Sequence, residues 1–167
     1  SLINVLTVIV MKKKDKNYYT FLILFFLIIL LIQKSFASES INFLSLKNNE
    51  VNVRVGPSKK YPIKFTYKKK YLPLEILDKS ETWRKIKDFE KNSGWIHISQ
   101  LSKKKSAINA KNNSILYKKS TIYSEPIAKL EIGRLVLIKK CKDKWCKITS
   151  GNYSGWIFQS SLWGKFK

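Results

Sequence analysis

The sequence predicts an all-β protein: two small β-barrels in tandem behind an N-terminal signal peptide helix. Three observations support this prediction. A lysine-led apolar segment stands near the N-terminus. The remainder of the chain is an internal duplication with a period of about 60 residues. Within each copy, short apolar runs are separated by polar turns, and outside the apolar segment no stretch keeps the 3.6-residue period of an amphipathic helix.

The segment 11–37 has the three parts of a secretory signal peptide in their usual order. Lysines follow Met11, residues 21–32 are an unbroken apolar run, and Ser35 and Ala37 place small residues before a cleavage site. An uncleaved membrane anchor is the alternative. Twelve helical residues rise only about 18 Å, against about 30 Å of hydrocarbon. We therefore expect cleavage after Ala37 and a periplasmic or secreted protein, with a membrane-anchored protein as the alternative.

Residues 1–10 do not belong to this pattern. They contain no methionine and precede the positively charged start of the signal peptide. We interpret them as probable upstream translation and leave them out of the fold prediction.

The net charge of +22 bears on the choice of partner. All but three of the 33 basic residues are lysine, and they are spread along the whole chain. Proteins that clamp phosphates or read bases favour arginine, whose planar fork binds them bidentately. A secreted chain also does not meet ordinary DNA or RNA. We therefore expect no nucleic-acid partner and interpret the charge mainly as a solvated surface, with attraction to an anionic membrane surface or acidic polymer as the alternative.

The two copies are expected over residues 43–102 and 107–164, joined by a linker at 102–107 that is short enough for the units to touch. They match at an offset of 62 residues, which falls to 61 after one deletion. The matched residues are Tyr61 with Tyr123, Leu74 and Ile76 with Val136 and Ile138, Trp83 and Ile86 with Trp145 and Ile148, Gly94–Ile96 with Gly155–Ile157, and Leu101 with Leu162.

Each copy reads as a hairpin followed by a further short strand. Residues 71–78 and 134–141 are predicted strands, and polar turns lead from them to return strands that begin at Trp83 and Trp145. A second turn leads to strands that contain a Gly-Trp pair. The glycine indicates a positive φ or a close approach of another backbone. We expect Trp95 and Trp156 of these pairs to be core residues first and binding residues only second.

At these residues the chain resembles the bacterial SH3-like domain family, whose members occur as tandem pairs in secreted proteins. The first copy carries NVRVGPS at 52–58, WRKI at 83–86, GWIH at 94–97 and a closing Leu101. The second copy is similar through Cys141, Trp145-Cys146, GWI at 155–157 and LWG at 162–164, so the resemblance covers about 43–164. It departs at 114–120, where SILYKKS lacks the Arg, Gly and Pro of the first copy.

The resemblance implies a non-catalytic module that binds a peptide, a protein or a cell-wall component such as peptidoglycan. Tyr61 and Tyr67 stand in a long segment that corresponds to the loop beside the ligand groove of SH3 domains, and aromatic grooves suit extended peptides. Arg54 can pair with a ligand carboxylate or hold that loop to the barrel. Association with anionic envelope surfaces, or a scaffold role in an envelope complex, are the alternatives. The candidate ligand-binding residues are Arg54, Tyr61, Tyr67, Trp83, Trp95 and His97.

The residues that usually carry catalysis are scarce. The single histidine, His97, lies in the first copy, whereas Cys141 and Cys146 lie in the second, so no Cys–His nucleophile pair is expected. Two cysteines and one distant histidine do not make a zinc site either. We expect no enzyme activity, no metal site and no cofactor. In an oxidising compartment the two cysteines indicate a disulfide. A redox-active pair is the alternative, although C-x₄-C differs from the redox motif C-x-x-C.

Overall fold

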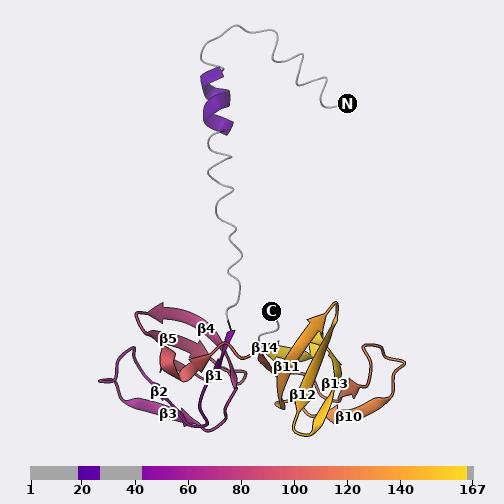
Figure 1. The fold of residues 1–167 in the computed structure, drawn as a ribbon. Coiled ribbons are helices and arrows are strands. Elements are labelled where there is room, and N and C mark those ends of the chain that lie inside the picture. The colour runs from indigo at the N-terminus through magenta and orange to yellow at the C-terminus, as the bar shows by residue number, and fades with distance from the viewer. Residues whose placement is uncertain (1–18, 27–42, 165–167) are drawn as a thin grey trace. The chain divides into compact units, whose positions relative to one another are not determined.

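The computed structural model describes residues 19–26 and 43–164 (Figure 1). Residues 19–26, within the predicted signal peptide, are helical, and nearly all of their side chains are exposed. Within the described ranges no helix has the length and apolar character needed to cross a membrane. The predicted cleavage site after Ala37 and the segment 1–10 lie outside the described residues.

The first copy is a seven-stranded antiparallel sheet that curls into a small barrel (Figure 1). The strands follow one another in the order β3-β2-β6-β5-β4-β1-β7 across the sheet. The elements are β1 (Phe43–Leu46), β2 (Val51–Arg54), β3 (Ile63–Tyr67), β4 (Pro73–Ser80), β5 (Trp83–Lys87), β6 (Ser93–His97), the 3₁₀ helix η2 (Ile98–Gln100) and β7 (Leu101–Ser102).

The second copy repeats this topology strand for strand, in the order β10-β9-β13-β12-β11-β8-β14. The predicted all-β class with two tandem barrels is thereby confirmed. The elements are β8 (Ser106–Asn109), β9 (Ser114–Tyr117), β10 (Pro126–Leu130), β11 (Leu135–Lys142), β12 (Trp145–Ser150), β13 (Tyr153–Phe158), the 3₁₀ helix η3 (Gln159–Ser161) and β14 (Leu162–Gly164).

Each barrel has its own apolar core, built by the two-residue alternation of its strands. In β6 the buried residues Gly94 and Ile96 alternate with Ser93, Trp95 and His97, which face outward. The first core consists of Leu46, Val51, Val53, Leu74, Ile86, Ile96 and Leu101. The second consists of Ala107, Leu116, Leu130, Val136, Ile138, Cys146, Ile148, Ile157 and Leu162. The inner face is thus aliphatic, and the tryptophans are left for the outer face.

The glycines of the Gly-Trp pairs are explained by close approach and not by a positive φ, because neither has one. A Cβ at Gly94 would lie 2.9 Å from the carbonyl oxygen of Arg54 and still closer to the Val53 side chain. A Cβ at Gly155 would lie 2.6 Å from the carbonyl oxygen of Tyr117. Any side chain here would force β6 away from β2, or β13 away from β9, and so would open the barrel.

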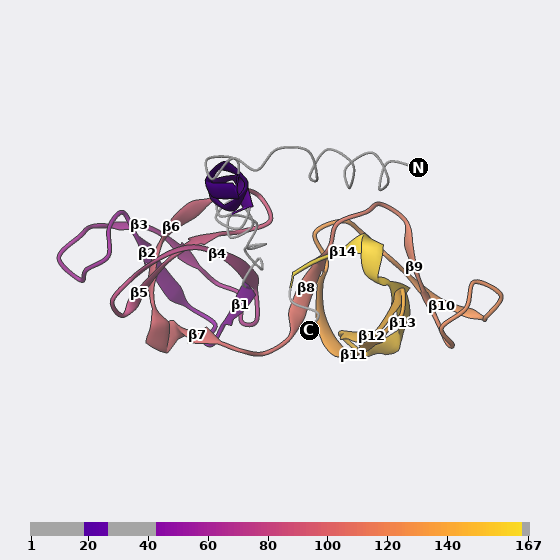
Figure 2. The same ribbon diagram turned by 90° about the horizontal axis from the view of Figure 1, so that it is seen from above.

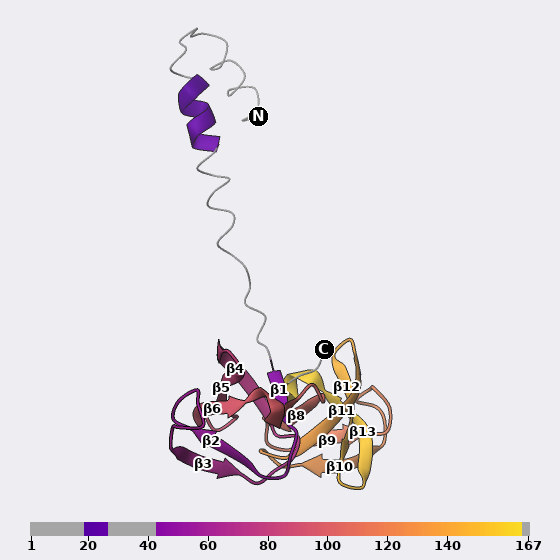
Figure 3. The same ribbon diagram turned by 60° about the vertical axis from the view of Figure 1, so that its left-hand side comes forward.

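A disulfide joins Cys141 to Cys146, as predicted. The two residues stand directly opposite each other in β11 and β12, with their Cα atoms 4.0 Å apart. Figure 3 shows these two strands side by side in the second barrel. Cys146 is fully buried in the second core. The first barrel has Lys79 opposite Arg84 at this place. The bond therefore crosslinks the hairpin of the second barrel only.

The linker between the barrels is shorter than predicted. Strand pairing extends through Ser102 and resumes at Ser106, so that only residues 103–105 lie between strands instead of the expected 102–107. The barrels contact each other, as the sequence indicated. Trp163 of β14 packs edge-on against Phe43, with ring centroids 4.9 Å apart, and lies 5.8 Å from Phe89.

Strand β8 shows how much of its surface this contact covers. All four of its residues are buried. In a strand with one solvated face only every second residue is buried. Ala107 belongs to the second core, so Ser106 and Ile108 on the opposite face are covered from outside that barrel, where β4 approaches β8 and β14.

Reducing the Cys141–Cys146 bond is expected to lower the free energy of unfolding. The loss should be only about 2 kcal/mol, because the bond closes a short loop and so constrains the unfolded chain little. The measurement is urea unfolding with and without reductant. A Cys141→Ser/Cys146→Ala double variant serves as the control and should not respond to reductant. An unchanged unfolding midpoint on reduction of the native protein would contradict this expectation.

Candidate functional site

The outer face of the first barrel gathers four of the six predicted binding residues. Trp83 of β5 stands opposite His97 of β6, and Arg54 of β2 stands opposite Trp95. Directly opposed residues of an antiparallel ladder project to the same side of the sheet. The Trp83 and His97 rings meet edge-on at 5.4 Å, and Trp83 is only 8% exposed. The four residues therefore form one aromatic, partly cationic surface.

The expectation that Trp95 and Trp156 fill the cores is wrong. Both are half-buried on the outer faces of β6 and β13, while their neighbours Ile96 and Ile157 point into the cores. The glycine before each tryptophan decides this, because it occupies the inward position where the next strand comes too close for a side chain. The two-residue alternation then directs the tryptophan outward.

Arg54 and Tyr61 are joined through the loop between β2 and β3. The Arg54 Nη1 donates a hydrogen bond of 2.6 Å to the backbone carbonyl of Tyr61. The Tyr61 ring lies over Gly56, where a Cβ would come within 2.6 Å of the ring. Arg54 therefore holds the loop to the barrel, and Tyr61, 46% exposed, borders the outer face. In Figure 2 this loop and its counterpart between β9 and β10 project from their barrels.

Tyr67 does not belong to this face. The sequence placed it in the loop, but it lies in β3, opposite Val51 and away from the loop end of the hairpin. Its hydroxyl donates to Oδ2 of the buried Asp88 at 2.9 Å. Asp88 also accepts hydrogen bonds from the backbone and side-chain amides of Asn92. Burial, and then the charge of Asp88, raises the pKa of Tyr67 well above its ordinary value. Tyr67 closes one end of the barrel.

The second barrel carries an aromatic cluster at the equivalent place, which was not predicted from the sequence. Trp145 stands opposite Phe158, as Trp83 stands opposite His97. The Trp145 and Phe158 rings stack at 4.0 Å, and Tyr117 meets Trp145 edge-on at 5.6 Å. The duplication could have predicted this cluster, because Trp145 matches the candidate binding residue Trp83.

The sequence alignment was one residue out in the β9–β10 region. Tyr117, and not Leu116, occupies the place of Arg54, because it pairs with Trp156 as Arg54 pairs with Trp95. Tyr61 likewise corresponds to Ser124 and not to Tyr123. The backbone N–H groups of Tyr61 and Ser124 donate equivalent hydrogen bonds across the same turn, each at 3.2 Å. The second barrel thus has a tyrosine where the first has its loop-holding arginine.

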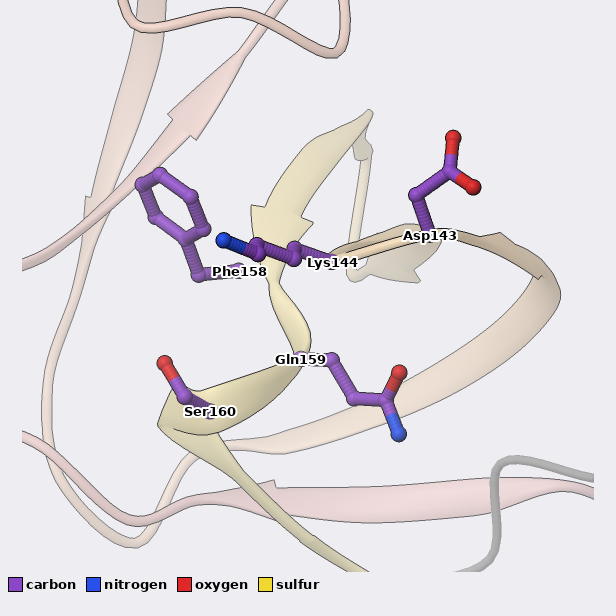
Figure 4. A pocket seen from close by; sticks show the side chains of 5 residues that line it. All are labelled: Asp143, Lys144, Phe158, Gln159 and Ser160. Carbon is purple, nitrogen blue, oxygen red and sulfur yellow. The ribbon is translucent and has the colours of Figure 1, made fainter.

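A pocket of about 520 Å³ lies beside the aromatic cluster of the second barrel (Figure 4). Asp143 and Lys144 come from the turn between β11 and β12, and Gln159 and Ser160 come from η3. Phe158, the last residue of β13, completes the lining. The lining residues are Asp143, Lys144, Phe158, Gln159 and Ser160.

A smaller hollow of about 220 Å³ also uses Phe158 and Tyr117, together with residues 111–115 that precede and begin β9. Phe158 therefore borders two hollows. Ligand sites usually combine apolar walls with a few polar groups. In the larger pocket Phe158 supplies the aromatic wall, and the other four lining residues are polar or charged.

Across residues 19–26 and 43–164, no group of three His, Cys, Asp or Glu side chains comes together. Both cysteines are used in the disulfide. The Nδ1 of His97 contacts the Ser99 hydroxyl at 2.8 Å and caps η2. What remains on each outer face is aromatic area with lysine, amide and hydroxyl groups at its border.

The family model described as "Bacterial SH3 domain" matches the chain twice, over residues 47–103 and 110–164. The chain belongs to the bacterial SH3 domain family. The two matches lie within the two barrels, so this protein is a tandem of bacterial SH3 domains. A search of curated proteins finds no match.

Among solved structures, the chain is similar to NlpC2 and NlpC1 from Trichomonas vaginalis. The identities are 15% and 14%, with TM-scores of 0.35 and 0.34. The alignments cover 77% and 78% of this chain, which spans about half the length of those structures, at 50% and 48%.

The raised pKa of Tyr67 predicts a pH dependence of stability. An unfolded tyrosine has a pKa of about 10 and loses its proton first, so the free energy of unfolding should fall as the pH rises above about 10. Tyr67→Phe should cost about 1–2 kcal/mol at pH 8 through the lost hydrogen bond to Asp88, and should weaken this decline. Urea unfolding at pH 8 and pH 11 measures both effects.

Tyr153→Phe is the matched control, because Tyr153 is 52% exposed. It should follow the native protein at both pH values. An equally steep decline in Tyr67→Phe and in the native protein would show that Tyr67 does not carry the pH dependence.

Proposed function

We propose that this protein is a non-catalytic, periplasmic or secreted module that binds a peptide-bearing cell-wall component, peptidoglycan, through the outer aromatic faces of its two SH3 domains. The observation that supports this most strongly is the cluster of Tyr117, Trp145 and Phe158 beside the 520 Å³ pocket. Membership of the bacterial SH3 domain family agrees with a binding module.

The chemistry of the pocket fits an extended, amide-rich ligand. The Phe158 ring, stacked on Trp145, offers apolar area for the stem of a peptide or the face of a sugar ring. Gln159 and Ser160 offer donors and acceptors for amides, and Lys144 a cation for a carboxylate. Such ligands bind aromatic grooves along their length, with polar groups at the rim setting the register.

The first domain offers a related but different face. His97 stands where the second domain has Phe158, and Arg54 stands where it has Tyr117. Arg54 is occupied by the Tyr61 carbonyl. The first domain also exposes less aromatic area than the second, since Trp83 is only 8% exposed. We assign the principal contact to the second domain and a supporting contact to the first.

The compartment and the charge are part of the same proposal. The predicted signal peptide delivers the chain to the envelope, where peptidoglycan is found. Thirty-three basic against eleven acidic residues attract the chain to acidic polymers without selecting a partner. Specific binding must therefore persist at physiological salt, which screens the interactions of exposed charges that are more than about 8 Å apart.

The test is co-sedimentation of the protein with purified peptidoglycan at low and at physiological salt. Phe158→Ala should weaken binding about tenfold at physiological salt, equivalent to about 1.4 kcal/mol, because it removes the wall shared by both hollows. Phe158→His places the residue of the first domain there and should retain most of the binding, since a flat ring is kept.

Lys144→Ala and Lys139→Ala form a matched pair of exposed lysines, of which only Lys144 lines the pocket. Lys144→Ala should weaken binding more than Lys139→Ala does. Equal losses from both lysines, together with unchanged binding by Phe158→Ala, would mean that the protein adheres through net charge alone.

A further inference from the structure

A third hollow in the second domain lies at the other end of the β12–β13 ladder from the aromatic cluster. The cluster is at the pair Trp145–Phe158, whereas this hollow is at the pair Ser150–Tyr153. Its volume is about 250 Å³. It shares no residue with the pocket at Phe158. The residues that line it are Ala128, Lys129, Leu130, Glu131, Arg134, Ser150 and Tyr153.

The first domain is filled at the same place. Phe65 and Tyr67 pack edge-on, with centroids 5.1 Å apart, against the first core. The Tyr67 hydroxyl binds Asp88, and Asn92 completes the network. Leu72 also packs against this core. Two aromatic rings and a buried carboxylate therefore plug this end of the first barrel.

The second domain has smaller residues in place of the two rings and the carboxylate of the plug, and larger residues in place of Asn92 and Leu72. The strand registers align Phe65 with Ala128 and Tyr67 with Leu130. They also align Asp88 and Asn92 with Ser150 and Tyr153. Leu72 and Arg134 also correspond. The carbonyl of Leu72 accepts the N–H of the last residue of β1, and the carbonyl of Arg134 accepts the N–H of the last residue of β8. The end of the barrel that a buried carboxylate and two rings fill in the first domain is therefore a hollow beside the Arg134 guanidinium in the second.

Hydrogen bonds hold the walls of this hollow in place. The Arg134 Nε donates to the Ser150 hydroxyl at 3.2 Å, and that hydroxyl donates to the Leu135 carbonyl at 3.3 Å. The fully buried Asn109 donates to the carbonyls of Leu130 and Glu131 at 3.1 and 2.8 Å. These contacts tie the loop between β10 and β11 to the core. One edge of the guanidinium is thereby fixed, and its two terminal nitrogens remain for a ligand.

The charges at the hollow are not satisfied within the described part of the chain. No ion pair within 4.0 Å there involves Lys129, Glu131 or Arg134. Two cations and one carboxylate give the hollow a net positive charge, and Ala128 and Leu130 give it an apolar floor. Arginine with a planar fork matches the geometry of a carboxylate.

We propose that this hollow binds the free carboxylate end of a short peptide or acylated amino acid. Arg134 pairs with the carboxylate, and a small side chain rests on Ala128 and Leu130. Lys129 alternates to the other side of β10 and contributes only to the positive charge around the hollow. The volume is below that of a typical drug-sized site, so it suits one or two small residues and not a glycan strand. The proposal does not depend on the function proposed for the Phe158 pocket, because the two sites share no residue.

The test is an NMR titration of the protein with N-acetyl-alanine, N-acetyl-alaninamide and inorganic phosphate as probes. N-acetyl-alanine should shift the amide resonances of Lys129, Arg134 and Tyr153 and should bind at least tenfold more tightly than the amide, which lacks the carboxylate. Phosphate should bind more weakly than N-acetyl-alanine because it does not use the apolar floor. Equal affinity for acid and amide, tighter binding of phosphate, or shifts confined to other residues would overturn the proposal.

Arg134→Leu tests the guanidinium while keeping the fold, because leucine is the residue of the first domain at this place. It should reduce the affinity for N-acetyl-alanine at least tenfold. Arg84→Leu removes an arginine of the first domain and should leave the affinity unchanged. Ala128→Phe restores part of the plug and should abolish binding while leaving the Phe158 site intact. Unchanged affinity in Arg134→Leu and in Ala128→Phe would exclude this site.

Discussion

The structure depends on one close approach in each barrel, between β6 and β2 and between β13 and β9. Gly94 and Gly155 make it possible, because a Cβ there would meet the facing backbone carbonyl at 2.9 and 2.6 Å. With the strands this close, the sheet can curl far enough to enclose a core of aliphatic side chains. A domain of some 60 residues buries little apolar surface, so its stability depends on keeping the barrel closed around that small core.

The same approach decides where the aromatic residues stand. Once glycine takes the inward position, the next residue must face outward. Trp95 and Trp156 are therefore surface residues, and so are the partners that pair with them across the ladder. Closing the barrel and building the outer face are consequences of one local constraint.

The sequence was sufficient for the fold and insufficient for the orientation of single side chains. The duplication, the polar turns and the Gly-Trp pairs predicted two barrels, and the spacing of Cys141 and Cys146 predicted their bond. The direction of Trp95 was wrong because a large apolar residue in a small domain is usually assigned to the core. Only the structure shows that Gly94 holds the inward-facing position, where the backbone of Arg54 leaves no room for a side chain.

Two further errors have physical causes. Tyr67 was assigned to a loop because its segment corresponds to the loop beside the ligand groove of SH3 domains, yet pairing with Val51 places it in a strand. The one-residue shift between Tyr61 and Ser124 arose because a tyrosine happens to stand next to the true match, Tyr123 being 92% exposed at the loop. Neither the pocket at Phe158 nor the hollow at Arg134 follows from sequence, because each is built from residues that only the β12–β13 ladder and its neighbouring loops bring together.

The two domains share a topology and differ at both ends of the barrel. The first has a carboxylate buried under two aromatic rings, and the second has a serine and an arginine there. Within the second core, Asn109 takes the place of Leu46, and its amide satisfies its hydrogen bonds with Lys111, Leu130, Glu131 and Ser114. Burial of such a polar group is tolerated only when its partners are present. The duplication has therefore kept the barrel while changing the surfaces that meet ligands.

The indole N–H resonances of the five tryptophans test the central claim most directly, because they report from different surfaces. Trp145 and Trp156 lie on the outer face of the second domain, whereas Trp163 packs between the domains against Phe43. Addition of soluble peptidoglycan fragments at physiological salt should shift the resonances of Trp145 and Trp156 and leave that of Trp163 unchanged. If Trp163 alone shifts, or none of the five does, the outer aromatic faces are not the binding surfaces.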